Sequence, residues 1–65
     1  MNDIWIEILF DGEPMDNVTA KDIEEAKQLI KSIEKNGFSE YNEEVKTEWL
    51  EMGFRNNPKV TARIS

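Results

Sequence analysis

The sequence predicts a small α+β domain in which a first strand, a long helix, a second helix and a final strand share one core. Three patterns predict it: period-two apolar spacing in residues 4–10, helical apolar spacing in residues 19–36, and alternation in residues 59–65. A chain of 65 residues makes one compact domain, placed at residues 1–65. Its core is thin at this length, and no cysteine is present to reinforce it.

The first expected element is a strand over residues 4–10. β-branched and aromatic residues dominate it, and its apolar face carries Ile4, Ile6, Ile8 and Phe10. The other face, where Trp5 and Leu9 flank Glu7, is too apolar for a fully solvated surface. This pattern indicates a central strand or a partly covered second face.

Asp11-Gly12-Glu13-Pro14 predicts a turn after this strand, since Gly and Pro are typical of turns. Residues 15–18 carry only a weak signal for a short returning strand. Asp11, Glu13 and Asp16 crowd the same loop with carboxylates, the ligands of hard cations. Their spacing lacks the alternating ligands, central Gly and closing Glu of a calcium loop, so we expect no metal site.

Residues 19–36 predict a long amphipathic helix. Thr19 is the expected N-cap, and Asp22 follows three residues later to help satisfy the amides of the first turn. One helical stripe is apolar and contains Ile23, Ala26, Leu29, Ile30 and Ile33. Asn36-Gly37 is a typical left-handed helix end, and Phe38 is its expected hydrophobic contact.

Residues 39–52 fit both a helix and a strand, and the sequence leaves the choice open for residues 43–52. A helix would be capped by Ser39 or Asn42, end at Gly53 and bear one apolar stripe of Tyr41, Val45, Trp49 and Met52. Its five Glu favour this form. In a strand, alternate residues from Tyr41 to Trp49 would share a face. The alternative fold is therefore one helix packed on a three-stranded antiparallel sheet.

Residues 55–58 predict a loop because Pro58 cannot continue a helix. Residues 59–65 predict a strand that pairs with the first one, with Val60, Ala62 and Ile64 on its apolar face. A sheet of two strands is marginally stable alone. Either the helices cover it well or two chains share it, so a homodimer is one expected state.

The composition argues against most kinds of catalysis. The chain has no His and no Cys, and its 14 acidic against 8 basic residues give a net charge of −6. The usual proton carrier near neutral pH and the usual thiol nucleophile are therefore missing. We expect no enzyme activity, no catalytic residue, no cofactor and no bound metal. The charge disfavours direct contact with nucleic acid or membranes and favours a protein partner with a basic surface.

The N-terminus is acidic where a signal peptide would be basic, and the first apolar run is far too short to cross a bilayer. These features predict a cytoplasmic protein.

An acidic ladder is the sharpest candidate site, conditional on the second helix. Glu40, Glu44, Glu48 and Glu51 are spaced by four, four and three residues, which places them on one helical face. Four residues rise about 6 Å along a helix, a repeat similar to that of nucleic-acid phosphates. Such a face would occupy the basic groove of a nucleic-acid-binding protein. It is equally typical of a solvated helix, or of carboxylates that face Lys27, Lys31 and Lys35 across the domain.

Aromatic residues are the expected anchors of that interface, because Trp and Tyr are frequent at protein–protein contacts. Trp49, Tyr41 and Phe54 are the candidates, with Trp5 a further one. In size and charge the chain is similar to the small acidic proteins by which phages and mobile elements block host enzymes. This resemblance implies an inhibitor or modulator of a host protein.

Two other functions are consistent with the sequence. The first is a self-assembling structural or regulatory dimer, or an accessory subunit. The second is a DNA-binding regulator that uses Arg55, Lys59 and Arg63, against which the overall negative charge argues.

Overall fold

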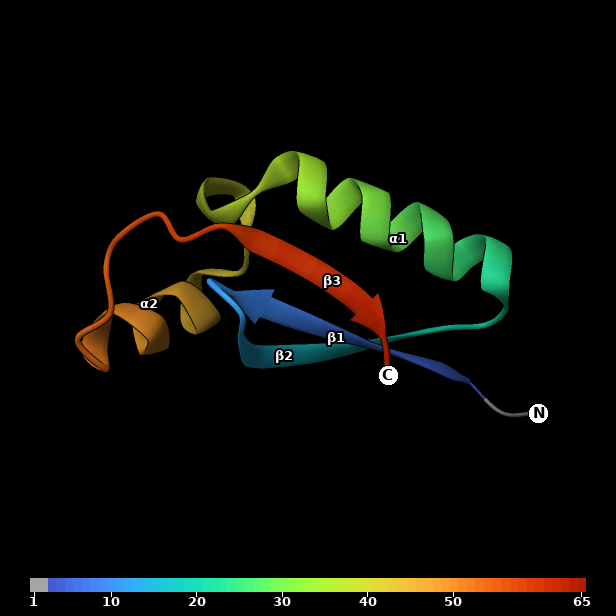
Figure 1. The fold of residues 1–65 in the computed structure, drawn as a ribbon, viewed down its shortest axis with the longest axis horizontal. Coiled ribbons are helices and arrows are strands. Elements are labelled where there is room, and N and C mark those ends of the chain that lie inside the picture. The colour runs from blue at the N-terminus through green and yellow to red at the C-terminus, as the bar shows by residue number, and fades with distance from the viewer. Residues whose placement is uncertain (1–2) are drawn as a thin grey trace.

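The computed structural model describes residues 3–65 as an antiparallel three-stranded sheet with two α-helices (Figure 1). In chain order the elements are β1 (Ile4–Phe10), β2 (Glu13–Ala20), α1 (Ile23–Asn36), the 3₁₀ helix η1 (Phe38–Glu40), α2 (Glu43–Glu51) and β3 (Val60–Ile64). The strand order is β2-β1-β3, so β1 is central. The predicted α+β class is confirmed. Within residues 3–65, no helix has both the length and the apolar character to cross a membrane.

A two-residue turn joins β1 to β2. Asp11 and Gly12 both have positive φ, 50° and 84°, as in the hairpin turns whose twist matches that of the strands. The register shifts by one residue between Ile8 and Leu9, which leaves Met15 as the extra residue of β2. The weak strand signal at residues 15–18 is thus a full strand. It supplies the third strand that the alternative fold assigned to residues around 41–49.

α1 begins later than predicted, because Asp22 and not Thr19 is its N-cap. The Asp22 carboxylate accepts the Glu25 N–H at 2.9 Å, and the Glu25 carboxylate accepts the Lys21 N–H at 2.9 Å. Thr19 lies in β2 opposite Trp5. The prediction of Thr19 as the cap was wrong because Thr is favourable in both a cap and a strand.

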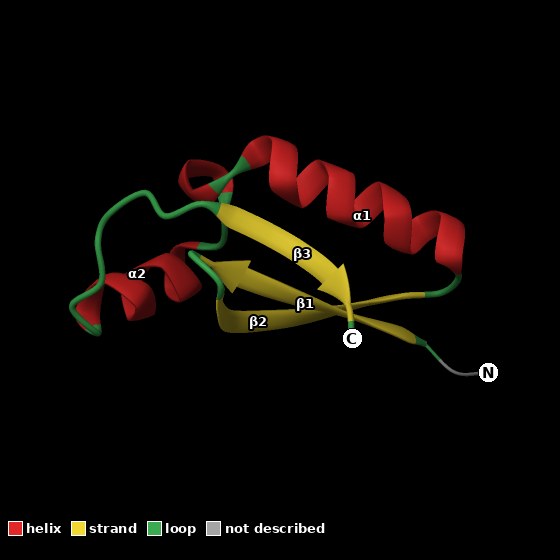
Figure 2. Ribbon diagram, in the orientation of Figure 1, coloured by secondary structure: helices red, strands yellow, loops and turns green. Residues whose placement is uncertain are grey.

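The core lies between α1 and one face of the sheet, with α2 beside the end where the hairpin turns (Figure 2). Phe10 is its aromatic centre, with ring centroids 5.2 to 5.4 Å from those of three other rings in edge-to-face geometry. The buried members of this cluster are Ile6, Ile8, Phe10, Ala20, Ala26, Phe38, Trp49 and Val60. The apolar face predicted for β1 is therefore the face that the core buries.

The opposite face of β1 is partly open. Trp5 is 55% exposed and Leu9 only 5%. Between them, the Arg63 guanidinium of β3 donates to the Glu7 carboxylate, with Nε 2.8 Å from Oε1. Trp5 is therefore accessible from solvent.

Candidate protein-binding surface on the second helix

The ambiguous stretch forms a helix that begins at Glu43. Tyr41 and Asn42 have extended backbone, and the Asn42 side chain accepts the N–H groups of Glu44 at 2.9 Å and Val45 at 3.2 Å. Asn42 is thus the N-cap, as one of the two predicted candidates. The extended residues also separate Glu40, in η1, from the carboxylates of α2. The acidic ladder of four predicted on one helix is wrong, and three of its members share α2.

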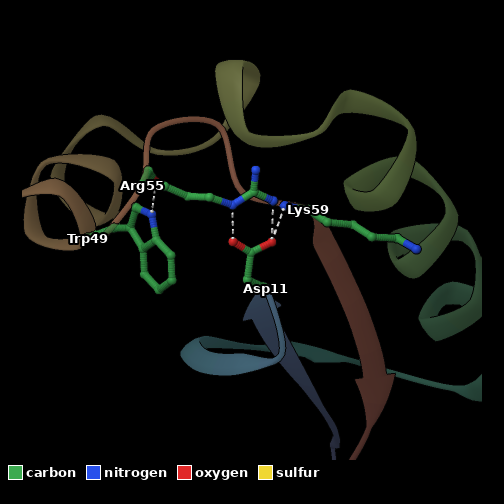
Figure 3. A network of polar contacts seen from close by, with 4 residues as sticks. All are labelled: Asp11, Trp49, Arg55 and Lys59. Carbon is green, nitrogen blue, oxygen red and sulfur yellow. Dashed lines mark hydrogen bonds and ion pairs between the residues drawn. The ribbon is translucent and has the colours of Figure 1, made fainter. Parts of the chain in front are cut away.

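Trp49 lies on the inner side of α2 and is 1% exposed. Its indole N–H donates to the Arg55 carbonyl at 2.8 Å (Figure 3), and the Phe54 ring stacks on it with centroids 4.3 Å apart. Trp49 therefore cannot contact a partner directly, and its assignment as an exposed anchor is corrected. Its helical spacing predicted that Trp49 lies on the apolar stripe, but spacing does not show which aromatic side chains are buried in the core.

Tyr41 is half-buried and fixes the start of α2 to the sheet. Its hydroxyl donates to Asp16 Oδ2 of β2 at 2.6 Å and its ring packs edge-on against Phe10. Burial, together with this hydrogen bond to a carboxylate, raises the pKa of Tyr41 well above its ordinary value. Tyr41 thus has a structural partner within the chain and does not project as an anchor.

Asp11 joins the hairpin turn to the loop after α2. Its carboxylate accepts from Arg55 Nε at 2.6 Å and Nη2 at 2.8 Å, and from the Lys59 N–H at 2.9 Å (Figure 3). The hydrogen bonds from Arg55 and Lys59 lower the pKa of Asp11 to about 2. This network leaves no local sequence pattern, because Asp11 and Arg55 are 44 positions apart.

These contacts bear on two hypotheses drawn from the sequence: DNA contact through Arg55, Lys59 and Arg63, and cation binding by the acidic loop. Arg55 is paired with Asp11, and Arg63 with Glu7, so both have acidic partners on the face considered for DNA contact. In the acidic loop, Asp11 and Asp16 are likewise engaged, by Arg55 and Tyr41. Residues 3–65 hold no cluster of three potential ligand side chains placed to bind a metal.

The outer side of α2 carries three exposed carboxylates, Glu44, Glu48 and Glu51, called here the acidic face. Seven residues of helix separate its ends, about 10 Å. In the described part of the chain, no side chain forms an ion pair with any of the three. Glu43 differs, because Lys46 Nζ lies 3.0 Å from its carboxylate. The lysines of α1 that were considered as intramolecular partners, Lys27, Lys31 and Lys35, form no ion pair within residues 3–65 either.

Exposed apolar side chains follow the acidic face at the end of α2. Leu50 is 44% exposed, Met52 50% and Phe54 46%, and we call these three residues the apolar tip. Gly53, at φ 88°, redirects the chain between Met52 and Phe54. The inner face of the Phe54 ring stacks on Trp49, so its outer face is held in a fixed orientation. Phe54 is thus a candidate anchor, with one face of its ring exposed.

Comparisons of the chain with known protein families, curated proteins and solved structures each found no match. The chemistry of this surface is therefore what supports a functional proposal.

Proposed function

We propose that this chain is a non-enzymatic binding module that inhibits or modulates a partner protein by docking the second helix on a basic surface. The acidic face steers the approach, and the apolar tip makes the desolvated contact. The carboxylates of the acidic face carry this proposal, because no cation in residues 3–65 pairs with them. Of the three, only Glu44 lies in the first turn of α2, where its charge interacts favourably with the helix dipole.

The arrangement suits such an interface. Interfaces combine an apolar centre with a charged rim, and complementary charge chiefly raises the rate of association. The spacing of Glu44, Glu48 and Glu51 is compatible with a surface that otherwise binds phosphates, which makes a nucleic-acid-binding protein the favoured partner class. The similarity in size and charge to the small acidic inhibitors of phages also supports the inhibition of a host protein.

Capture from a cell lysate tests the proposal with two variants of equal net charge. The first is Glu44→Lys, Glu48→Lys and Glu51→Lys on α2. The second reverses three exposed carboxylates elsewhere, Asp3→Lys, Glu13→Lys and Glu24→Lys. We expect the control variant to retain the proteins captured by the wild type and the α2 variant to lose them. Added duplex DNA should also displace these proteins. Equal capture by both variants would contradict the proposal.

A self-assembling dimer is the second candidate, favoured by the exposure of Trp5 on the open face of β1. Light scattering over a concentration series tests it. A mass that rises above 7.6 kDa with concentration in the wild type, but not in Trp5→Ser, would support it. A constant mass of one chain would exclude it.

A further inference from the structure

The sheet has two outer edges, and the hydrogen-bond pattern shows which backbone groups they expose. The Asp11 N–H donates to the Lys59 carbonyl and the Ser65 N–H to the Trp5 carbonyl. Because alternate residues of a strand direct their backbone groups to opposite sides, odd-numbered residues of β1 face β3 and even-numbered ones face β2. By the register, Asn17 and Thr19 of β2, and Ala62 and Ile64 of β3, turn their backbone groups outward.

The β3 edge is closed at its centre by α1. The Glu34 carboxylate accepts the outward N–H of Ala62 at 3.1 Å. A carboxylate in this position repels the carbonyl of an approaching strand and occupies the donor that it needs. The N–H of Ala62 is therefore not available to an added strand, and α1 packs more extensively against β3 than against the other two strands.

The β2 edge is closed only in part. The Asp16 carboxylate accepts the outward N–H of Asn17 at 2.9 Å. The outward N–H and carbonyl of Thr19 and the carbonyl of Asn17 have no partner within residues 3–65. One donor and two acceptors are thus available to an added strand around Val18.

A groove runs beside this edge on the α1 side of the sheet. It has a volume of about 480 Å³, and its apolar wall is formed by Val18, Leu29, Ile33 and Tyr41. Asp16 and Glu40 bring negative charge to the same groove. Side chains at alternate positions of a strand share a face, so Val18 and Asp16 face the groove side together.

We propose that the β2 edge binds an extended segment of a protein partner as a fourth strand. The charge and spacing define that segment: an apolar side chain enters the groove beside Val18, and a Lys or Arg two residues away lies beside Asp16 and Glu40. Backbone hydrogen bonds to Thr19 and Asn17 supply affinity, and the groove supplies sequence preference. This site does not include the acidic face of α2, so either proposal stands if the other fails.

A seven-residue peptide, Thr-Lys-Thr-Val-Thr-Lys-Thr, is the probe. Its Lys residues lie two positions from Val on both sides, so it matches the groove in either strand direction. The control peptide Thr-Thr-Lys-Val-Lys-Thr-Thr has the same composition but places Val and Lys on opposite faces. In NMR titrations of the labelled wild-type chain, we expect the probe to shift the amides of residues 17–19 and the control peptide to bind about tenfold more weakly. Shifts confined to other regions, or equal binding of both peptides, would overturn the proposal.

Proline substitution tests the backbone contact. Thr19→Pro removes the exposed N–H from the β2 edge without breaking a bond to β1. We expect it to weaken probe binding about tenfold, a loss typical of one hydrogen bond in a short complex. Ile64→Pro makes the same change on the β3 edge, which lies outside the proposed site, and should leave binding unchanged. If both variants bind the probe as tightly as the wild type does, no strand is added at Thr19. If Thr19→Pro does not fold, the titration of the wild type with the two peptides tests the proposal on its own.

Discussion

The two helices contribute to the fold in different ways. α1 has 14 residues, and its apolar stripe packs against the core from Ala26 to Ile33, whereas Ile23, predicted on the same stripe, is 46% exposed. α2 has 9 residues, of which only Trp49 is fully buried. The difference shows that the sheet and α1 form most of the core, whereas α2 is held at one end by a large aromatic anchor. The outer side of α2 is therefore exposed, and no cation in residues 3–65 pairs with Glu44, Glu48 or Glu51.

The largest effect is expected at that anchor. Trp49→Ala should lower the free energy of unfolding by about 3–5 kcal/mol, because it removes a buried indole and leaves a cavity against Phe10. Urea denaturation measures this loss. Leu50→Ala, at an exposed neighbouring position, should cost under about 1 kcal/mol. Similar losses in the two variants would show that Trp49 does not anchor α2.

Substituting the N-cap residues of the two helices shows how much capping contributes to the stability of each. Asn42→Ala and Asp22→Ala each delete the side chain that accepts first-turn N–H groups, and each should cost about 1 kcal/mol. We expect Asn42→Ala to cost more, because Asn42 caps two N–H groups and α2 is the shorter helix. Thermal unfolding followed by circular dichroism checks this order. A larger cost at Asp22 would indicate that α2 depends on tertiary contacts alone.

The loop after α2 should weaken in acid. Since Asp11 has a pKa of about 2 in the folded chain, below its unfolded value, it stabilises the fold above about pH 4. That contribution should be lost as pH falls from about 4 toward 2. The difference in unfolding free energy between wild type and Asp11→Asn, measured across this range, should shrink on acidification. A difference independent of pH would argue against the contact between Asp11 and Arg55.

The smallest effect on stability is expected on the acidic face. Glu44→Gln, Glu48→Gln and Glu51→Gln remove charges that no cation in residues 3–65 pairs with. We expect each substitution to change the free energy of unfolding by no more than about 0.5 kcal/mol. The loss of repulsion between neighbouring carboxylates stabilises the helix, whereas the loss of the Glu44 charge from the first turn destabilises it. Urea denaturation at low salt is the measurement. A marked destabilisation would show that these carboxylates serve the fold.

Strong periodic patterns explain what the sequence predicted. The apolar faces of β1 and β3 and the stripe of α1 each repeat over several residues, so burial on one side determines their structure. The predicted face of β3 is buried only in part, because Ile64 at its end is 44% exposed. β2 was underestimated because Pro14, Asp16 and Asn17 have low strand propensity. It forms because the Asp11-Gly12 turn and the register of β1 bring it into the sheet.

The site was predicted less well, for a physical reason. Glu40 is separated from α2 by two extended residues, and helical spacing alone does not reveal such a break. Trp49 and Phe54 are both aromatic and near the helix end, yet only Trp49 reaches the core. Tertiary contacts decided which one is exposed. The polar contacts of Asp11 and Tyr41 join distant parts of the chain and leave no local pattern.

The dependence of the association rate on ionic strength tests most directly whether α2 is a steering surface. A protein captured by the wild type, and lost by the α2 charge-reversal variant, is immobilised and its association rate measured at low and high salt. We predict that the wild-type rate falls steeply as salt increases, whereas the rate for the variant is low and nearly independent of salt. A wild-type rate that does not change with ionic strength would contradict the proposed role of the acidic face.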